Sequence, residues 1–350
     1  MQIVPFHCLI FCSPIETQRF AAYERVSLQA VATDLLGEDR RDLHAIVFAE
    51  LCHRVGLKLS LGQRVAISDT LTPPQRKQLA SIAATQGASV IDWQPDTDLA
   101  ACLPTMPQEH LRTHWKGITV VGDVHGEQAA MHKALQWATA RHHFVWLLGD
   151  VIDYGADTLA TAEMAYHLVM RGDGAIIIGN HERKIARWLD QCEAGRPHVR
   201  LNDGNRVTVA ALNRLKPASR KQWIGRFRAL LGHATLLQQI DNTTLLHGAA
   251  HPSLWSEANP AMIEQFALYG EADYGSGKFR RAHHWIDTVP AGQLVFVGHD
   301  VVSQFPTIVT GAKGGQVVFL DTGSGIGGHL STADLRFTDC GLRLECFNRH

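Results

Sequence analysis

Short apolar runs recur along this chain after residue 112, and most of them are bounded by glycine. The runs span residues 118–121, 144–148, 175–178, 245–246, 294–297 and 317–320. They are rich in Val, Ile and Leu and too short to form helices, so they predict buried β-strands. Glycine beside the end of a strand allows the backbone to turn sharply and a ligand to come close.

The apolar period changes after each of the first three runs. Apolar residues then recur at helical spacing, at Met131, Leu135 and Ala138, at Leu159, Ala162, Tyr166 and Val169, and at Ile185, Trp188, Leu189 and Cys192. This pattern predicts strand, loop and helix three times in succession, which is typical of an α/β fold. Ligands of open α/β sheets lie beyond the carboxyl ends of the strands, so functional residues are expected there.

Oxygen and imidazole ligands follow the predicted strands. The motifs are Gly122-Asp123-Val124-His125-Gly126, Gly149-Asp150-Val151-Ile152-Asp153, Gly179-Asn180-His181-Glu182, His247 and Gly298-His299. Hard ligands delivered from several strand ends suit a two-metal site, and such a site hydrolyses phosphate esters. Most of the 20 histidines are better explained as core or surface residues, but that explanation does not account for the ordered set of motifs.

Chemistry suggests a role for each ligand. Asp123 and His125 are two positions apart on an extended chain, so both side chains can turn toward one metal ion, and Asp150 can bridge that ion to a second. The second ion would be completed by Asn180, His247 and His299. Mn²⁺ is the expected ion, with Fe or Zn as alternatives, because this ligand set does not choose sharply among them.

Two further residues are candidates for proton transfer. A metal-bound hydroxide would attack phosphorus in line, because a bound metal lowers the pKa of water to about 7. His181 lies next to a ligand but is not assigned as one, so it would protonate the leaving oxygen. Asp153 would hold the His181 ring in the useful tautomer and raise its pKa.

The chain resembles the calcineurin-like metallophosphoesterases in five motifs: GDVHG, GDVID, GNHE, the histidine of LLHGA and the GH of FVGHD. Within them it resembles the branch that holds the Ser/Thr phosphoprotein phosphatases and the bacterial polynucleotide kinase-phosphatases. The stretches ALYGEADYGSGKFRRAHHW and LDTGSGIGGHLSTADLRF are most similar to the phosphatase module of the latter. The resemblance implies a sandwich of two mixed sheets flanked by helices, which we expect over residues 113–350.

Tyr154 departs from the family pattern. The branch usually has Asp-Arg-Gly where this chain has Asp153-Tyr154-Gly155, and the family's arginine binds phosphate in a bidentate manner. A tyrosine hydroxyl offers one neutral hydrogen bond instead. Either Tyr154 is a weaker phosphate ligand, with Arg183, Arg280 or Arg281 binding the phosphate, or it is a harmless variation packed under the loop.

Residues 1–112 form a different kind of sequence. The stretches RVSLQAVATDLLGEDRRDL and GQRVAISDTLTPPQRKQLASIAATQGASVIDW resemble, in order and spacing, the kinase domain that precedes the phosphatase in polynucleotide kinase-phosphatases. A phosphate-binding loop needs glycines and a lysine, and residues 13–20 contain neither. We therefore interpret the segment as a degenerate kinase-like lobe kept for folding, dimerisation or substrate docking. The alternative is an unrelated α/β lobe.

Charge and composition exclude some classes of function but do not identify the substrate. The formal net charge of −1 argues against a general coating of nucleic acid or membrane. Residues 183–228 nevertheless hold twelve Lys or Arg and three acidic residues, which predicts either a basic helical cap beside the metals or a solvated helix face. Seven scattered cysteines and the lack of a long apolar span predict a cytoplasmic protein without a membrane segment.

These observations predict a metal-dependent phosphoesterase. Nucleic-acid or nucleotide phosphate is the first candidate substrate because of the resemblance to the kinase-phosphatases. A Ser/Thr protein phosphatase is the second candidate because the core motifs are shared. The third is a weakly active metal-binding scaffold or docking protein, for which Tyr154 and the degenerate first lobe are the reasons.

Overall fold

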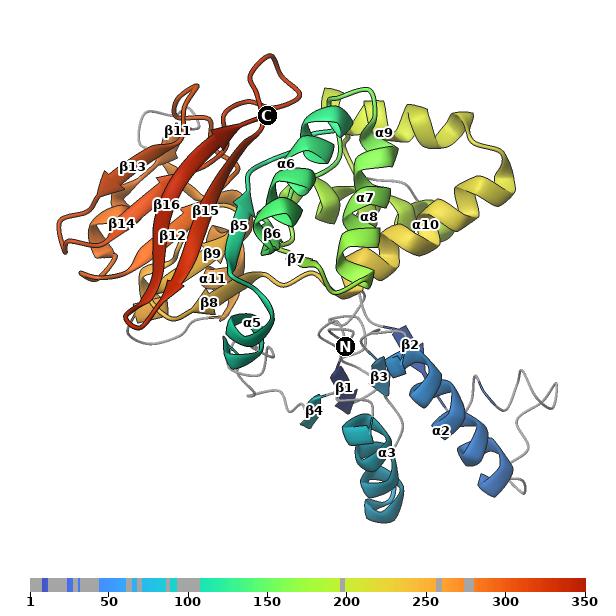
Figure 1. Cartoon of the computed structure of the whole chain (residues 1–350). Helices are drawn as coiled ribbons and strands as arrows, with labels where there is room; N and C mark the ends of the chain where they lie inside the picture. The colour runs from blue at the N-terminus through green and yellow to red at the C-terminus, as the bar shows by residue number, and fades with distance from the viewer. Residues whose placement is uncertain are drawn as a thin grey trace. The chain divides into compact units, whose positions relative to one another are not determined.

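The computed structural model describes residues 8–11, 24–27, 31, 44–60, 65–67, 71–85, 89–92, 108–195, 199–255, 260–273 and 280–350 (Figure 1). The chain divides into two compact units. The first contains Met1–Pro104, Met170–Gly172 and Arg228–His233, and the second contains the rest. A boundary between separate domains at residues 112 and 113 stays a prediction.

The first unit contains a parallel four-stranded sheet in the order β2-β3-β1-β4. Its elements are β1 Cys8–Phe11, β2 Glu24–Val26, α2 His44–Ser60, β3 Val65–Ile67, α3 Pro73–Thr85 and β4 Ser89–Asp92. Helix α2 buries Val47, Leu51, Val55 and Leu59, which are four residues apart and therefore share one face. An α/β lobe is thus present, while the kinase-like interpretation stays a prediction because residues 13–20 lie outside the described residues.

The second unit contains two five-stranded sheets and most of the helices. The helices that lie wholly or mostly in this unit are α5 Gln108–His114, α6 Gln128–Arg141, α7 Thr158–Met170, α8 Asn180–Glu193, α9 Asp203–Arg214, α10 Pro217–Gly232, η3 Pro252–Trp255, α11 Pro260–Tyr269 and η4 His284–Thr288. Its strands are β5 Gly117–Val121, β6 His143–Leu147, β7 Gly174–Ile176, β8 Leu237–Ile240, β9 Thr243–Leu246, β10 Glu271–Asp273, β11 Arg280–Ala282, β12 Leu294–Val297, β13 Thr307–Thr310, β14 Gln316–Phe319, β15 Ser331–Thr338 and β16 Gly341–Arg349.

Both large sheets are mixed, as the resemblance to the family implied. One has the order β16-β15-β5-β6-β7, in which β5, β6 and β7 are parallel and β15 and β16 are antiparallel. The other has the order β13-β14-β12-β9-β8, with a parallel centre and an antiparallel strand at each edge. Each of the six apolar runs lies in or beside one of these strands, and helices α6, α7 and α8 follow the first three.

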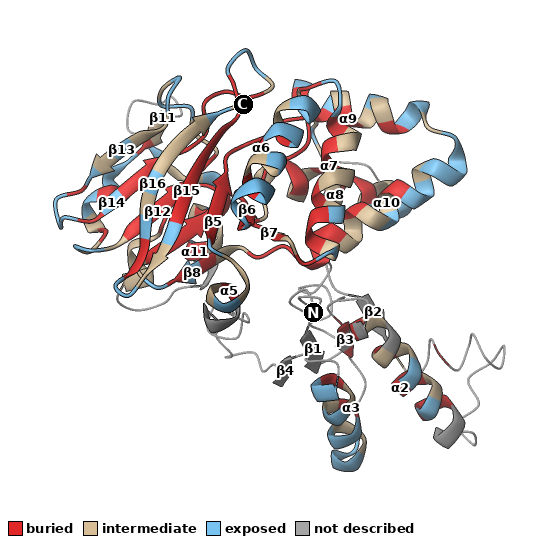
Figure 2. Ribbon diagram, in the orientation of Figure 1, coloured by how far each residue is buried: buried red, intermediate tan, exposed pale blue. Residues whose placement is uncertain are grey.

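Burial explains why these runs form strands. Every residue of β5, β6, β9 and β12 is buried, so continuous apolar runs suit them. Figure 2 shows the same contrast, with buried strands in the centre and helices such as α6 and α10 exposing one face. No helix in the described parts of the chain is both long and apolar enough to cross a membrane.

The basic segment covers most of α8 together with α9 and α10, and the last two helices pack on α7. The indole of Trp223 donates to the carbonyl of Leu159 at 3.0 Å, and the hydroxyls of Thr158 and Thr208 lie 2.6 Å apart. Figure 1 shows the two helices beside α7 and α8. Helix α9 thus follows the helix that begins with the GNHE motif, and the choice between a basic cap beside the metals and a solvated helix face stays a prediction.

The carboxylate of Asp334 in β15 forms buried contacts with β5 and α6. These contacts lie away from the strand ends that carry the motifs. Asp334 is fully buried and accepts from the hydroxyl of Thr119 at 2.7 Å and the indole of Trp137 at 2.8 Å. Nε of Arg141 lies 3.3 Å from the same carboxylate. Burial alone would raise the pKa of Asp334, but hydrogen bonds, with that of His143 the strongest, hold the pKa well below its ordinary value.

We expect Asp334→Ala to destabilise the protein by about 3 kcal/mol, because it leaves buried donors and the Arg141 charge without their partner. Urea unfolding measures the loss. The control is Glu345→Ala, which removes an exposed ion pair with Arg336 on the same sheet and should cost less than about 1 kcal/mol. Since the pKa of Asp334 is depressed on folding, its stabilisation is complete above about pH 4 and is lost as the pH falls further. Equal effects of the two variants would contradict this assignment.

Candidate metal centre

The ends of strands from both sheets meet at one place. Asp123 follows β5, and its Oδ2 accepts from the backbone N–H of His299, which follows β12, at 3.0 Å. His247 follows β9, and its Nδ1 lies 2.8 Å from the carbonyl of Leu148 beside β6. A Cβ at Gly298 would collide with Oδ1 of Asp123, so only glycine allows this approach.

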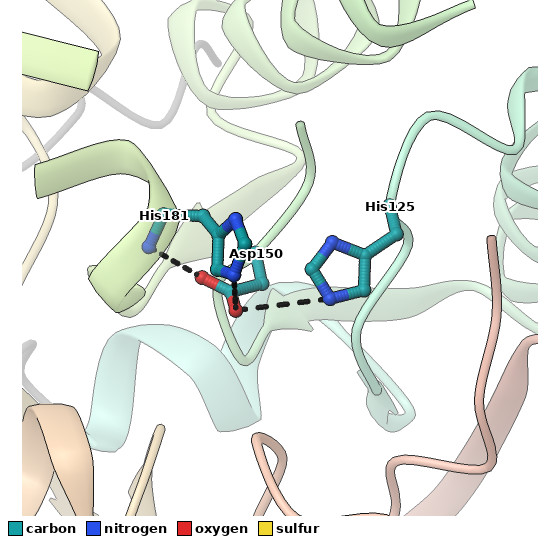
Figure 3. Close-up of side chains that lie close together, drawn as sticks. All are labelled: His125, Asp150 and His181. Atoms are coloured by element: carbon teal, nitrogen blue, oxygen red, sulfur yellow. Dashed lines mark hydrogen bonds and ion pairs between the residues drawn. The ribbon is translucent and has the colours of Figure 1, made fainter. Parts of the chain in front are cut away.

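Asp150 lies at the centre of the cluster. Its Oδ2 lies 3.8 Å from Nε2 of His125 and 3.3 Å from Nε2 of His247, and its Oδ1 accepts from the backbone N–H of His181 at 3.0 Å. Figure 3 shows the rings of His125 and His181 next to the same oxygen of this carboxylate. Asp150 also has a φ of 48°, a conformation that non-glycine residues rarely adopt and that is common at functional sites.

Two sets of side chains share Asp150 and could each hold a cation. One is His125, Asp150 and His181, and the other is Asp150, His247 and His299. The side-chain oxygen of Asn180 lies 2.9 Å from Nε2 of His247, which brings the amide to the second set. The structure thus brings together all six predicted ligands, and their roles as ligands remain our proposal.

The chemistry of the donors fits divalent cations. Oδ1 of Asp123 is buried and has no hydrogen-bond partner among the described residues, an arrangement that is costly for a carboxylate unless a cation satisfies it. Burial, followed by the nearby carboxylates of Asp321 and Asp150, raises the pKa of Asp123 well above its ordinary value. Two bound cations would neutralise this concentration of buried acids.

His181 is held by a buried network on its far side. Its Nδ1 lies 2.6 Å from Oδ2 of Asp153, and that carboxylate also accepts from Asn205 and Thr208 of α9. Burial lowers the pKa of His181, but Asp150 and the hydrogen bond to Asp153 outweigh it and raise the pKa to about 9. Nε2 is thereby turned toward the cluster, 3.9 Å from Oδ2 of Asp150, where it can serve either as a proton donor or as a ligand.

The model of the calcineurin-like phosphoesterase family matches residues 117–303, which is more than half of the chain. The chain belongs to this family. It is therefore a phosphoesterase, a hydrolase whose candidate metal ligands are the residues described above.

Relatives of this phosphoesterase carry more specific names. A protein of Geobacillus sp. (strain WCH70) named bis(5'-nucleosyl)-tetraphosphatase PrpE (asymmetrical) is 28% identical over 231 residues, which cover 61% of this chain and 88% of the relative. A protein of the same name from Geobacillus thermodenitrificans is 26% identical over 235 residues, with the same coverage. A solved structure of a serine/threonine phosphatase from Saccharomyces cerevisiae is 12% identical with a TM-score of 0.42, and the match covers 79% of this chain and 95% of that one.

The structure separates the three arginines predicted to bind phosphate. Arg281 and His299 share a neighbour, the carbonyl oxygen of Tyr269. It lies 3.4 Å from Nη1 of Arg281 and 3.2 Å from Nε2 of His299, so Arg281 borders the metal centre of the phosphoesterase. Arg280 is its exposed neighbour in β11 and points to the opposite face, because side chains alternate along a strand. Arg183 forms an ion pair with Glu264. Arg281 is thus the best placed of the three.

Tyr154 lies against the two histidines. Its ring centroid is 4.8 Å from that of His125 and 5.3 Å from that of His181. The far end of the ring packs on Gly204 of α9, where an added Cβ would come within 2.8 Å of it. Tyr154 is therefore packed under α9 and also borders the metal centre, so its location agrees with both interpretations.

Other residues of the site were missed in the sequence. Glu182 is fully buried, and its carboxylate accepts from the backbone N–H groups of Asp150 at 2.7 Å and Val151 at 2.8 Å. Burial raises the pKa of Glu182 to about 7. Asp321 follows β14, and its charge acts on Asp123. The position of Asp321 after an apolar run was a usable signal, whereas nothing local indicates that Asn205 and Thr208 hold Asp153.

Proposed function

We propose that this phosphoesterase hydrolyses nucleotide phosphates through a dinuclear metal site, with a bis(nucleosyl) tetraphosphate as the first candidate substrate. The observation that carries the metal-dependent reaction is the clustering of His125, His247 and His299 around Asp150, next to a buried Asp123 oxygen that has no partner among the described residues. The named relatives support the choice of substrate. Phosphorylated nucleic-acid ends, which the resemblance to kinase-phosphatases suggests, are the second candidate.

The chain's own residues position and protonate the substrate. Asp123, His125, Asp150, Asn180, His247 and His299 would hold the two ions. Bound ions would polarise the phosphoryl oxygens and supply hydroxide near neutral pH. His181 would donate the proton on Nε2 to the leaving oxygen while Asp153 fixes its ring. Arg281 would bind a substrate phosphate beside His299 through charge-assisted hydrogen bonds.

Tyr154 favours a substrate without a terminal phosphate. A phosphate monoester carries close to two charges near neutral pH and gains most from a guanidinium partner. Each phosphate within a polyphosphate chain capped at both ends carries a single charge and gains less. Replacing the family's arginine by Tyr154 therefore weakens monoester binding most. This supports a dinucleoside polyphosphate over a phosphoprotein.

Three further parts of the proposal concern the setting of the reaction. Mn²⁺ is the ion we expect, with Fe or Zn as alternatives. We place the reaction in the cytoplasm. We also propose that residues 1–112 are a degenerate kinase-like lobe that acts in dimerisation or substrate docking.

Turnover with and without metal tests the function. The full chain, stripped with a chelator and then reloaded with Mn²⁺, should hydrolyse p-nitrophenyl phosphate and diadenosine tetraphosphate only when metal is present. A 5'-phosphorylated oligonucleotide and a phosphopeptide are the competing substrates. Preference for the phosphopeptide would favour the protein phosphatase, and no turnover of any substrate with metal bound would favour the scaffold.

We expect Tyr154→Arg to raise kcat/KM for p-nitrophenyl phosphate by about tenfold, the size of the ~1 to 2 kcal/mol difference between a charged and a neutral hydrogen bond. The effect on a phosphodiester analogue should be smaller. Steady-state kinetics on both esters measure the ratio, and Tyr154→Phe controls for loss of the hydroxyl alone. An unchanged ratio would mean that another group, with Arg281 the first suspect, already binds the monoester phosphate.

A further inference from the structure

A cavity of about 580 Å³ lies between η4, β13 and β14. Its lining residues are His283, Ile286, Asp287, Val302, Ser303, Thr307, Val309, Thr310 and Phe319. The volume falls in the range of sites for small organic ligands. None of these residues belongs to the set proposed above to hold metal or transfer protons.

The cavity is joined to the metal centre by a short chain of contacts. Nε2 of His283, on the cavity wall, lies 2.8 Å from Oδ2 of Asp300. Nε of Arg281 lies 3.3 Å from Oδ1 of the same carboxylate, and Asp300 directly follows His299. Asp300 therefore contacts both the cavity wall and the arginine that borders the metal centre.

The walls suit an uncharged, flat ligand that has hydrogen-bonding edges. Val302, Val309 and Phe319 provide apolar surface, and the ring of His283 packs edge-on against Phe319 at 5.2 Å. Hydroxyl groups of Ser303, Thr307 and Thr310 can both donate and accept. Asp287 places a carboxylate at the cavity, and no Lys or Arg is among the lining residues, so the cavity suits a neutral group better than a phosphate.

We infer that this cavity binds a nucleoside of the substrate while the phosphates lie at Arg281 and the metals. The inference rests on the proposed function, because it names the part of a nucleotide substrate that lies away from the reaction. The separation of charge supports it: the cationic side chain lies toward the metals, and the neutral and acidic side chains lie in the cavity. Base faces would contact Val302 and Phe319, and the hydroxyl groups would bind the polar edges of the base or the ribose.

Two adjacent valines provide a matched test. Val302 lines the cavity and is 40% exposed, whereas Val301 is 43% exposed and does not line it. Val302→Trp should fill the cavity without disturbing the core, and Val301→Trp adds the same side chain elsewhere. We expect Val302→Trp to raise KM for diadenosine tetraphosphate by about tenfold or more, with kcat/KM for p-nitrophenyl phosphate unchanged. Val301→Trp should change neither value.

The outcomes separate this inference from the proposed function. Equal effects of both variants on diadenosine tetraphosphate, or a loss confined to a phosphopeptide substrate, would overturn the nucleoside site and leave the metal-dependent reaction standing. Absence of diadenosine tetraphosphate hydrolysis by the wild-type protein would overturn that substrate proposal instead. Saturation-transfer NMR with adenosine and the full chain tests the nucleoside site without the reaction. Loss of the adenosine signal in Val302→Trp but not in Val301→Trp supports the site. No adenosine signal with the wild-type protein overturns it.

Discussion

Asp150→Asn should remove both bound metal and activity from this phosphoesterase. Asp150 is the residue shared by the two candidate ligand sets, and asparagine keeps its size while removing its charge. Changing a residue that only supports a metal ligand typically lowers metal affinity or activity by about 10- to 100-fold. We therefore expect kcat/KM for p-nitrophenyl phosphate to fall by more than about 100-fold, and the metal content measured by mass spectrometry to fall with it.

The control for this change is Asp339→Asn, the same chemical change at an exposed residue between β15 and β16. It should keep wild-type metal content and kinetics. In the Asp150→Asn variant the side-chain amide oxygen can still accept from the backbone N–H of His181, so the loop should retain its fold. Full activity in Asp150→Asn, with both metals bound, would refute the assignment of Asp150 as the bridging ligand.

The sequence predicted those parts of the fold that are apolar and continuous. Strands such as β5 and β12 are buried on both faces, so their runs of Val, Ile and Leu are visible without any knowledge of their neighbours. Strand β15 was missed because it buries Ser331, Thr332 and Asp334. Buried polar side chains of β15 form hydrogen bonds with the neighbouring strand, as when Thr119 donates to Asp334. A hydropathy pattern along one segment does not show such a hydrogen bond between strands.

The same limit applies to the site. Ligands directly after strands were found because parallel strands deliver their carboxyl ends to one edge. The residues that hold Asp153 were not found, since Asn205 and Thr208 lie about fifty residues further along the chain. Only the packing of α9 on α7 brings them to it. Arg280 and Arg281 could not be separated either, because the choice depends on which face of β11 lies toward His299.

His181→Ala should keep the metals and lose turnover, in contrast to Asp150→Asn. General acid catalysis contributes typically about 10²- to 10⁴-fold, so kcat should fall by that amount while metal content stays unchanged. The loss should be smaller for p-nitrophenyl phosphate than for phenyl phosphate, because p-nitrophenolate is a better leaving group and needs less protonation. Asp153→Asn should act in the same direction, since it removes the carboxylate that orients the ring.

The matched control is His167→Ala, at a histidine of α7 whose side chain is 52% exposed. It should leave both substrates unaffected, and any change there would mark a general effect of losing imidazole. Metal content and the difference in activity between the two esters must be measured together in the His181→Ala variant. If His181→Ala loses metal and is impaired equally on both esters, then His181 is a ligand with His125 and Asp150, as their geometry allows. The proton donor would then be another group at the site.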